Sequence, residues 1–253
     1  MKKNLWSIGS VFVLFIIWIL LSTLIGNEIV MPSPFQTIRA FFGILTQDNS
    51  LQAILFSLYR LIIALFVASL LGVTLGVVSG LNHRFRLIVR PIVSVLRTIP
   101  VISIVVILLI VFGFTLTPYL ITFLMIFPII FQAISDGIEN LDQELVDVFL
   151  LEDDAFIDGV RYCYLPLIGP QIKTSLLQSA GLGIKVLVMA EYLAQTKNSI
   201  GNSLYLAKVN LDYSQVFAWT ILLIIMALII EQFIRRFSYQ KTDNVSVKPY
   251  SKE

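Results

Sequence analysis

Residues 54–78 read ILFSLYRLIIALFVASLLGVTLGVV, and Arg60 is the one charged side chain among them. About 20 helical residues are enough to cross the hydrocarbon core of a bilayer. This stretch is therefore predicted to be a membrane-spanning helix, and similar apolar runs lie on both sides of it. Together they predict six spans, at residues 5–25, 54–78, 88–112, 119–135, 172–194 and 216–237.

The predicted spans have to be helical, because lipid cannot satisfy exposed backbone amides and only helices or closed barrels cross it. The strands of a barrel would alternate in polarity, and these runs do not. The whole chain is 57% hydrophobic and 13% charged, with a mean hydropathy of +0.88, whereas soluble domains are about 25% charged. The predicted fold class is an all-α polytopic membrane protein.

The sequence offers few residues for catalysis or metal binding. Cys163 is its only cysteine and His83 its only histidine, which excludes a disulfide within the chain and a cysteine-rich metal site. The patterns H-E-x-x-H, C-x-x-C and G-x-x-x-x-G-K-[ST] do not occur, so zinc hydrolysis, dithiol redox chemistry and P-loop nucleotide binding lack their usual residues. We expect no enzyme activity, no catalytic or metal-binding residue and no cofactor.

Lysines and arginines gather before the first span, between the second and third, after the fourth and after the sixth. Because cytoplasmic loops carry an excess of these residues, both termini and residues 136–173 are predicted to be cytoplasmic. The first apolar run is longer than that of a signal peptide and no cleavage site follows it, so we expect it to remain as a span. The expected organisation is a first span with an external segment (1–53), a transmembrane domain (54–237) and a disordered cytoplasmic tail (238–253).

Residues 136–173, DGIENLDQELVDVFLLEDDAFIDGVRYCYLPLIGPQIK, separate two apolar runs and hold nine of the sixteen acids. Apolar residues recur with helical spacing over residues 141–151, which predicts an amphipathic helix. Asp153 and Asp154 then interrupt the pattern, and Asp154 suits the N-cap of a second helix at residues 155–164. The helix, break and helix predict an element that lies across the cytoplasmic face; the alternative is a solvated loop.

Polar residues inside the spans are candidates for a translocation path, because charges at membrane depth have to face protein or water. Lys185 and Glu191 lie in the fifth span, six residues apart, and so on different helix faces. Arg97 and Pro100 lie in the third span, where the proline predicts a kink. That kink is either a hinge at the path or an anchored structural bend.

Gly72, Gly76 and Gly80 recur every fourth residue of the second span and leave one helix face without side chains. A second helix can approach such a face closely. The face is either an ordinary packing surface within the chain or a surface that moves or meets a second copy.

The polar segment resembles the cytoplasmic motif E-A-A-x3-G-x9-I-x-L-P of the permease subunits of bacterial ABC importers, which are binding-protein-dependent inner-membrane components. The likeness is to their nitrate, sulfonate and taurine branch. With Leu165-Pro166 on the final pair, Asp147-Val148-Phe149 falls on the E-A-A triplet, Asp153 on the glycine and Cys163 on the isoleucine. Further matches follow in order: Pro32-Ser33-Pro34, Leu96-Arg97-Thr98-Ile99-Pro100, Phe127-Pro128, and Ala190-Glu191 followed by Ile200-Gly201.

The resemblance implies a coupling site for ATPase subunits in this segment. Its expected residues are Asp147, Val148, Phe149, Asp153, Asp154, Gly159, Arg161, Leu165 and Pro166. The sequence departs from the motif, because Asp153 replaces the glycine and Val148 and Phe149 replace small alanines. We expect these changes to reshape the contact, and the acids at residues 152–154 to favour a basic partner surface.

The same resemblance implies a bacterial cell-membrane protein that acts as a homodimer or beside a similar chain, binds two ABC ATPase subunits and receives solute from an extracytoplasmic binding protein. Lipid is its other expected partner, and nucleic acid is not one. The implied cargo is a small anion such as a sulfonate, nitrate or taurine, or a vitamin-precursor pyrimidine. Two other classes stay open from the residues: a self-sufficient secondary transporter or channel, which would use Lys185 and Glu191, and a membrane assembly factor.

Overall fold

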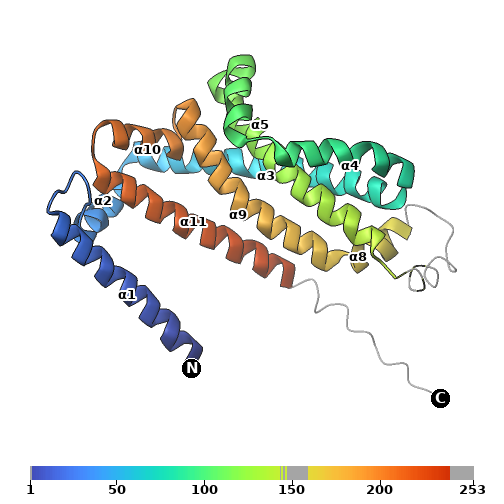
Figure 1. The fold of residues 1–253 in the computed structure, drawn as a ribbon, viewed down its shortest axis with the longest axis horizontal. Coiled ribbons are helices and arrows are strands. Elements are labelled where there is room, and N and C mark those ends of the chain that lie inside the picture. The colour runs from blue at the N-terminus through green and yellow to red at the C-terminus, as the bar shows by residue number, and fades with distance from the viewer. Residues whose placement is uncertain (1, 143, 145, 147–158, 240–253) are drawn as a thin grey trace. The chain divides into compact units, whose positions relative to one another are not determined.

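The computed structural model describes residues 2–142, 144, 146 and 159–239. The regular structure of these residues is helical throughout (Figure 1), which confirms the predicted all-α architecture. The helices are α1 (Lys2–Ile25), α2 (Pro34–Thr46), α3 (Asp48–Leu81), α4 (His83–Thr98), α5 (Val101–Glu139), the π-helix η1 (Gly159–Tyr164), α8 (Leu165–Leu167), α9 (Gly169–Ala194), α10 (Ile200–Val209) and α11 (Tyr213–Tyr239).

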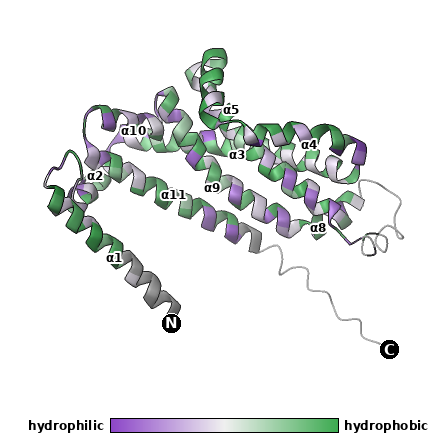
Figure 2. Ribbon diagram, in the orientation of Figure 1, coloured by the Kyte–Doolittle hydropathy of each residue, from purple (hydrophilic) through white to green (hydrophobic). Residues whose placement is uncertain are grey.

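Four helices of the described chain are long and apolar enough to cross a membrane, namely α3, α5, α9 and α11. The apolar part of α1, Phe12–Ile25, is shorter. Hydrophobic residues dominate α3, α5 and α11, whereas α4 and α9 carry polar and apolar residues together (Figure 2). The expected fourth span, residues 119–135, lies within the part of α5 that follows the non-helical residue Gly113.

The expected third span, residues 88–112, is wrong as a single helix. It is divided between α4 and the start of α5 by Ile99, whose extended backbone (φ −69°, ψ 130°) ends α4, and by Pro100. A proline lacks the N–H that would continue the helical ladder, and it pushes the preceding residue out of the α region. A second break inside α5 lies at Gly113, whose φ of 71° and ψ of −174° are not helical and which a residue without Cβ adopts readily.

The chain divides into two compact units: Met1–Tyr59 with Glu191–Met226, and Arg60–Ala190 with Ala227–Glu253. In the second unit, α3 packs on α5 through its glycine face. A Cβ added to Gly72, Gly76 or Gly80 would lie 2.6–2.8 Å from the nearest atom of Ile130, Ile134 or Ile138, respectively. The glycine face is thus a packing surface within the chain, as one of the two sequence readings predicts.

The pairs formed by these glycines and isoleucines advance together along the sequence, so α3 and this part of α5 run parallel. Between the glycines, Ser79 and Ser135 share a hydrogen bond of 2.9 Å and are both buried. Ile126, Ile130, Phe131 and Ile134 of α5 are almost fully buried in the same core. This packing fixes the C-terminal half of α5 against the C-terminal half of α3.

The first unit joins α1 and α2 to the start of α3, the end of α9, α10 and the first part of α11. Ser33 begins α2 with a capping box, in which its hydroxyl accepts from the Gln36 amide and the Gln36 side chain accepts from the Ser33 amide. Trp18 of α1 stacks on Phe217 of α11 at 5.7 Å, and its indole N–H donates to the Pro32 carbonyl at 3.1 Å. These contacts attach α1 to the unit.

Candidate functional site: the coupling segment and the α4–α5 seam

The expected coupling residues lie partly within the described chain. Asp147, Val148, Phe149, Asp153 and Asp154 lie outside the described residues, as does most of the amphipathic helix expected at 141–151. The remaining four, Gly159, Arg161, Leu165 and Pro166, lie in η1 and α8. The helix expected at residues 155–164 is thus helical in its described part, as a π-helix over Gly159–Tyr164.

The residues of η1 differ in exposure. Gly159 and Cys163 are buried, whereas Arg161 is exposed and its guanidinium lies over the Tyr162 ring, 5.5 Å from the centroid. Burial raises the pKa of the Cys163 thiol above its ordinary value, because a low-polarity environment disfavours the thiolate. Cys163 therefore acts as a core residue, while Arg161 is accessible to a partner.

Both ends of the segment are fixed to the core of the second unit. On the α5 side, a Cβ added to Gly137 would contact Ile168 at 3.4 Å and Gln171 at 3.5 Å. On the α9 side, Ile168 is fully buried, and Tyr164 and Leu165 pack on the same cluster as Ile138. The chain thus leaves the end of α5 and re-enters at α9 beside it.

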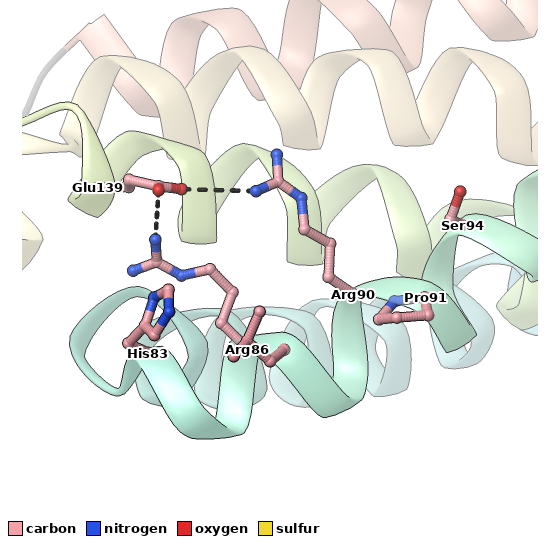
Figure 3. A pocket seen from close by; sticks show the side chains of 7 residues that line it. His83, Arg86, Arg90, Pro91, Ser94 and Glu139 are labelled. Atoms are coloured by element: carbon pink, nitrogen blue, oxygen red, sulfur yellow. Dashed lines mark ion pairs between the residues drawn. The ribbon is translucent and has the colours of Figure 1, made fainter.

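Arg86 connects the ends of three helices at this place. Its Nε donates to the Ser79 carbonyl at 2.9 Å and one Nη to the Gly80 carbonyl at 2.7 Å, which satisfies two acceptors in the last turn of α3. Its other Nη forms an ion pair with Glu139 at the end of α5 (Figure 3). A cation at the C-terminus of a helix also complements the helix dipole.

Further polar pairs follow from Arg86 along α4 and α5, which run antiparallel here. Arg90 lies 3.4 Å from Asp136 and 3.7 Å from Glu139, and Arg97 donates to the side-chain oxygen of Gln132. We call this surface the α4–α5 seam. It consists of Arg86, Arg90, Ser94 and Arg97 on α4 with Gln132, Ser135, Asp136 and Glu139 on α5.

Two adjoining hollows lie along the seam. One, of about 300 Å³, is lined by His83, Arg86, Leu87, Arg90, Pro91, Ser94 and Glu139 (Figure 3). The other, of about 100 Å³, is lined by Arg90, Val93, Ser94, Arg97, Phe131, Gln132, Ser135 and Asp136. Arg90 and Ser94 line both hollows.

The two candidate path residues of the expected fifth span lie in different surroundings, as their spacing predicts. Lys185 is exposed on α9, whereas Glu191 is fully buried. The Ser57 hydroxyl lies 2.8 Å from both Glu191 carboxylate oxygens, and its Oγ accepts from the Ile200 amide at 3.0 Å. The Gly201 amide donates to Glu191 at 3.3 Å. Glu191 thus lies at the N-terminus of α10, where a negative charge is favoured.

The sequence interpretation missed Ser57, Arg86 and Gln132 as members of these clusters. Ser57 lies in an apolar run, where a hydroxyl on its own indicates no particular partner. Arg86 reads as one of several basic loop residues, although it is the one that binds the end of α3. Gln132 reads as a polar residue near the end of a span, and the spacing of α4 against α5 that pairs it with Arg97 is set by the helix packing.

Comparison with known proteins agrees with this architecture. The binding-protein-dependent transport system inner membrane component family matches residues 70–239. The taurine transport system permease protein TauC of Escherichia coli (strain K12) is 28% identical over 198 residues, which are 76% of this chain and 72% of TauC. The putative aliphatic sulfonates transport permease protein SsuC of Bacillus subtilis (strain 168) is 22% identical over 239 residues, 92% of this chain and 86% of SsuC.

Among solved structures, a chain of the MetNI methionine ABC transporter in an inward-facing conformation superimposes with a TM-score of 0.64. The likeness covers 77% of this chain and 99% of that chain at 15% identity, and it concerns the fold. The family match covers well over half of the sequence and contains α4, α5, η1, α9 and α11. The chain therefore belongs to the binding-protein-dependent transport system inner membrane component family and is a permease subunit of an ABC importer, not an enzyme.

Proposed function

We propose that this permease forms, with a second copy of itself, the membrane path of an importer for a small organic anion of the sulfonate class. Two ATPase subunits bind the cytoplasmic segment between α5 and α9, and an extracytoplasmic binding protein delivers the solute to the opposite face. Both termini are cytoplasmic in this arrangement, which follows the distribution of lysine and arginine.

The observation that carries the proposal is the attachment of both ends of the coupling segment to one packed group of helix ends. Glu139 at the end of α5 is bound by Arg86, which also holds the end of α3. Ile168 at the start of α9 is buried against Gly137 of α5. A displacement of the segment by the ATPases therefore moves α5 and α9 with it, since close-packed elements transmit displacement rather than absorb it.

The segment itself supplies the contact with the ATPases. Asp147, Val148, Phe149, Asp153 and Asp154 form its acidic and bulky part, and Arg161, Leu165 and Pro166 form the return to α9 beside Gly159. Arg161 is exposed and available to a partner. The closing ATPases bias the permease between inward-facing and outward-facing states through this contact, as a ligand shifts a two-state equilibrium.

For the path, we propose that Arg97, Pro100 and Lys185 face it and that Glu191 positions α10. Pro100 separates α4 from α5 and supplies a bend next to Arg97. Lys185 is exposed on a membrane-spanning helix, where a charge is costly unless it meets protein or water. The cargo assignment is supported by the relatives named for taurine and aliphatic sulfonates and by the arginines of the seam.

The test is reconstitution of the permease with its neighbouring ATPase and binding protein in proteoliposomes. We expect ATP hydrolysis to rise when the loaded binding protein is added, and labelled taurine or an alkanesulfonate to accumulate only with ATP. Uptake without ATP would instead indicate a secondary transporter. Absence of both uptake and stimulated hydrolysis with taurine, alkanesulfonates, nitrate and a pyrimidine would contradict a transport role.

A further inference from the structure

The α4–α5 seam carries more positive charge than its own carboxylates neutralise. Three arginines, Arg86, Arg90 and Arg97, line its hollows together with two acids, Asp136 and Glu139. Both acids lie near Arg86 and Arg90, at the C-terminal end of α5. Within the described chain, the hydrogen bond that holds Arg97 goes to the neutral side chain of Gln132.

The uncompensated charge of Arg97 also lies away from the C-terminal end of α5. Gln132 precedes Glu139 by seven residues, which places it about 10 Å further into α5, since a helix rises 1.5 Å per residue. α5 is one of the membrane-spanning helices. A guanidinium at that depth has to face protein or a water-filled space, and the Arg97 side chain is exposed.

The residues around Arg97 provide the other groups that an oxyanion needs. Arg90, Ser94 and Arg97 are spaced by four and three residues, so they share one face of α4. Ser94 lines both hollows. The hollow at Arg97 measures about 100 Å³ and is also lined by Gln132 and by Ser135, whose hydroxyl is buried and shares a hydrogen bond with Ser79. It exceeds the space that one water molecule requires.

The other side of α4 differs in character. Ile88, Ile92 and Val95 are 57–67% exposed and apolar, whereas Val93 is buried and Val89 packs against the core. An arginine that only extended to the membrane surface would need no hydroxyl, no amide and no hollow beside it. The polar groups instead gather on the face of α4 that lies toward α5.

We propose that Arg90, Ser94 and Arg97, together with Gln132, form a transient binding site for the oxyanion group of the cargo, a sulfonate or a group of the same charge and shape. This inference rests on the proposed transport function and adds to it a place where the anion is bound on its way through the permease. Arg97 supplies the free positive charge and the fork of donors that suits three-oxygen anions. Arg90, partly held by the acids, supplies the second charge toward the end of α5.

The test measures the electrostatic field at Ser94 in the full transporter, without ATP or binding protein, so that it does not depend on transport. Ser94→Cys is introduced in a Cys163→Ser background, and its thiol is modified with methanethiosulfonates that carry a sulfonate, a trimethylammonium or no charge. We expect the sulfonate reagent to react faster than the cationic one. Arg97→Gln should lower that ratio about tenfold, the effect of one unit charge at several ångströms in an intermediate dielectric, and Arg97→Lys should keep it.

Ligand protection supplies the second measurement. Millimolar taurine or inorganic sulfate should slow the neutral reagent at Ser94→Cys, compared with chloride at equal ionic strength, because screening alone is the same in both. The matched control is Val95→Cys on the apolar face, where neither charge preference nor protection is expected. The vesicles are made of phosphatidylcholine, with and without phosphatidylglycerol.

The outcomes separate the possible occupants. Protection by sulfate and taurine in pure phosphatidylcholine supports a site for a small anion. Protection that appears only with phosphatidylglycerol assigns the site to a lipid headgroup and overturns the cargo assignment. The site itself is overturned if Arg97→Gln leaves the ratio of the sulfonate rate to the cationic rate unchanged and neither anion protects the thiol. This outcome would hold even where reconstitution demonstrates sulfonate uptake.

Discussion

Arg86 of α4 and Glu139 of α5 form an ion pair, and the same guanidinium donates to the carbonyls of Ser79 and Gly80. The Arg86 side chain is 11% exposed, whereas that of Glu139 is 40% exposed. The two partners therefore contribute differently. Most of the stabilisation comes from the carbonyl contacts that end α3, and the more exposed ion pair adds little.

This asymmetry predicts unequal effects of the two substitutions. Arg86→Ala should lower the free energy of unfolding by about 2–3 kcal/mol, because it leaves two part-buried carbonyls without a charged donor. Glu139→Gln should cost about 0.2–1 kcal/mol, as for an exposed ion pair. Thermal unfolding of the purified permease in detergent measures both. Equal losses of unfolding free energy in the two variants would show that the ion pair, and not the carbonyl contacts, contributes most of the stabilisation by Arg86.

Gly76→Ala should destabilise the packing of α3 on α5. The added Cβ would lie 2.8 Å from Cβ of Ile134 and 3.0 Å from the carbonyl oxygen of Phe131, so the backbones have to separate. Overpacking of this kind costs about 1–3 kcal/mol. The matched control is Gly181→Ala in α9, where no atom lies within 4 Å and the higher helix propensity of alanine applies.

Thermal unfolding again compares the two variants. A stable Gly76→Ala permease would mean that α3 and α5 are less closely packed in the membrane than in this structure. Loss of stability in both variants would point to a general effect of alanine in these helices and not to the contact with Ile134.

The sequence predicts the spans well and their interruptions poorly. Apolar length defines α3, α9 and α11, because lipid imposes that length on any helix that crosses it. It does not separate α4 from α5, since Ile88 to Phe112 is apolar throughout its second half and the break depends on one proline. Pro100 is visible in the sequence, but whether a proline kinks a helix or ends it depends on the packing around it.

In the candidate site, too, the sequence predicts what depends on neighbouring residues and misses what depends on distant ones. The spacing of Lys185 and Glu191 predicts that they lie on different faces, and the structure places one at the surface and the other in the core. The partner of Glu191 could not be predicted, because Ser57 is separated from it by 134 residues. Likewise, the pairing of Arg97 with Gln132 follows from how α4 lies on α5 and not from either residue's neighbours.

Ser57→Ala should loosen the start of α10. The Ser57 hydroxyl bonds the Glu191 carboxylate and accepts from the Ile200 amide, so its loss leaves a buried donor unsatisfied at a cost of about 1–3 kcal/mol. Hydrogen exchange of the Ile200 and Gly201 amides should become faster, while amides in the core of α5 stay protected. Ser203→Ala is the control, because the Ser203 hydroxyl donates to the carbonyl of Ser199, the N-cap residue of the same helix.

Equal acceleration in the Ser57 and Ser203 variants would contradict the role of Ser57. It would mean that α10 opens by fraying, whatever holds its first turn. Faster exchange of the α5 core amides as well would show that Ser57→Ala loosens the whole permease and that Glu191 does more than position α10.

Cys163 should react slowly with thiol reagents. Its reaction rate should keep rising at pH values at which an ordinary cysteine is already fully ionised. Burial raises the pKa of this thiol, and the thiolate is the nucleophile, so at pH 8 a smaller fraction is reactive. The comparison is Tyr162→Cys in a Cys163→Ser background, since Tyr162 is 63% exposed beside it. At pH 8 the wild-type permease should be modified by N-ethylmaleimide at least about tenfold more slowly. The rate for Tyr162→Cys should level off above a pH of about 8.5, the ordinary pKa, while that for Cys163 continues to rise; matching profiles would mean that η1 leaves Cys163 open to water.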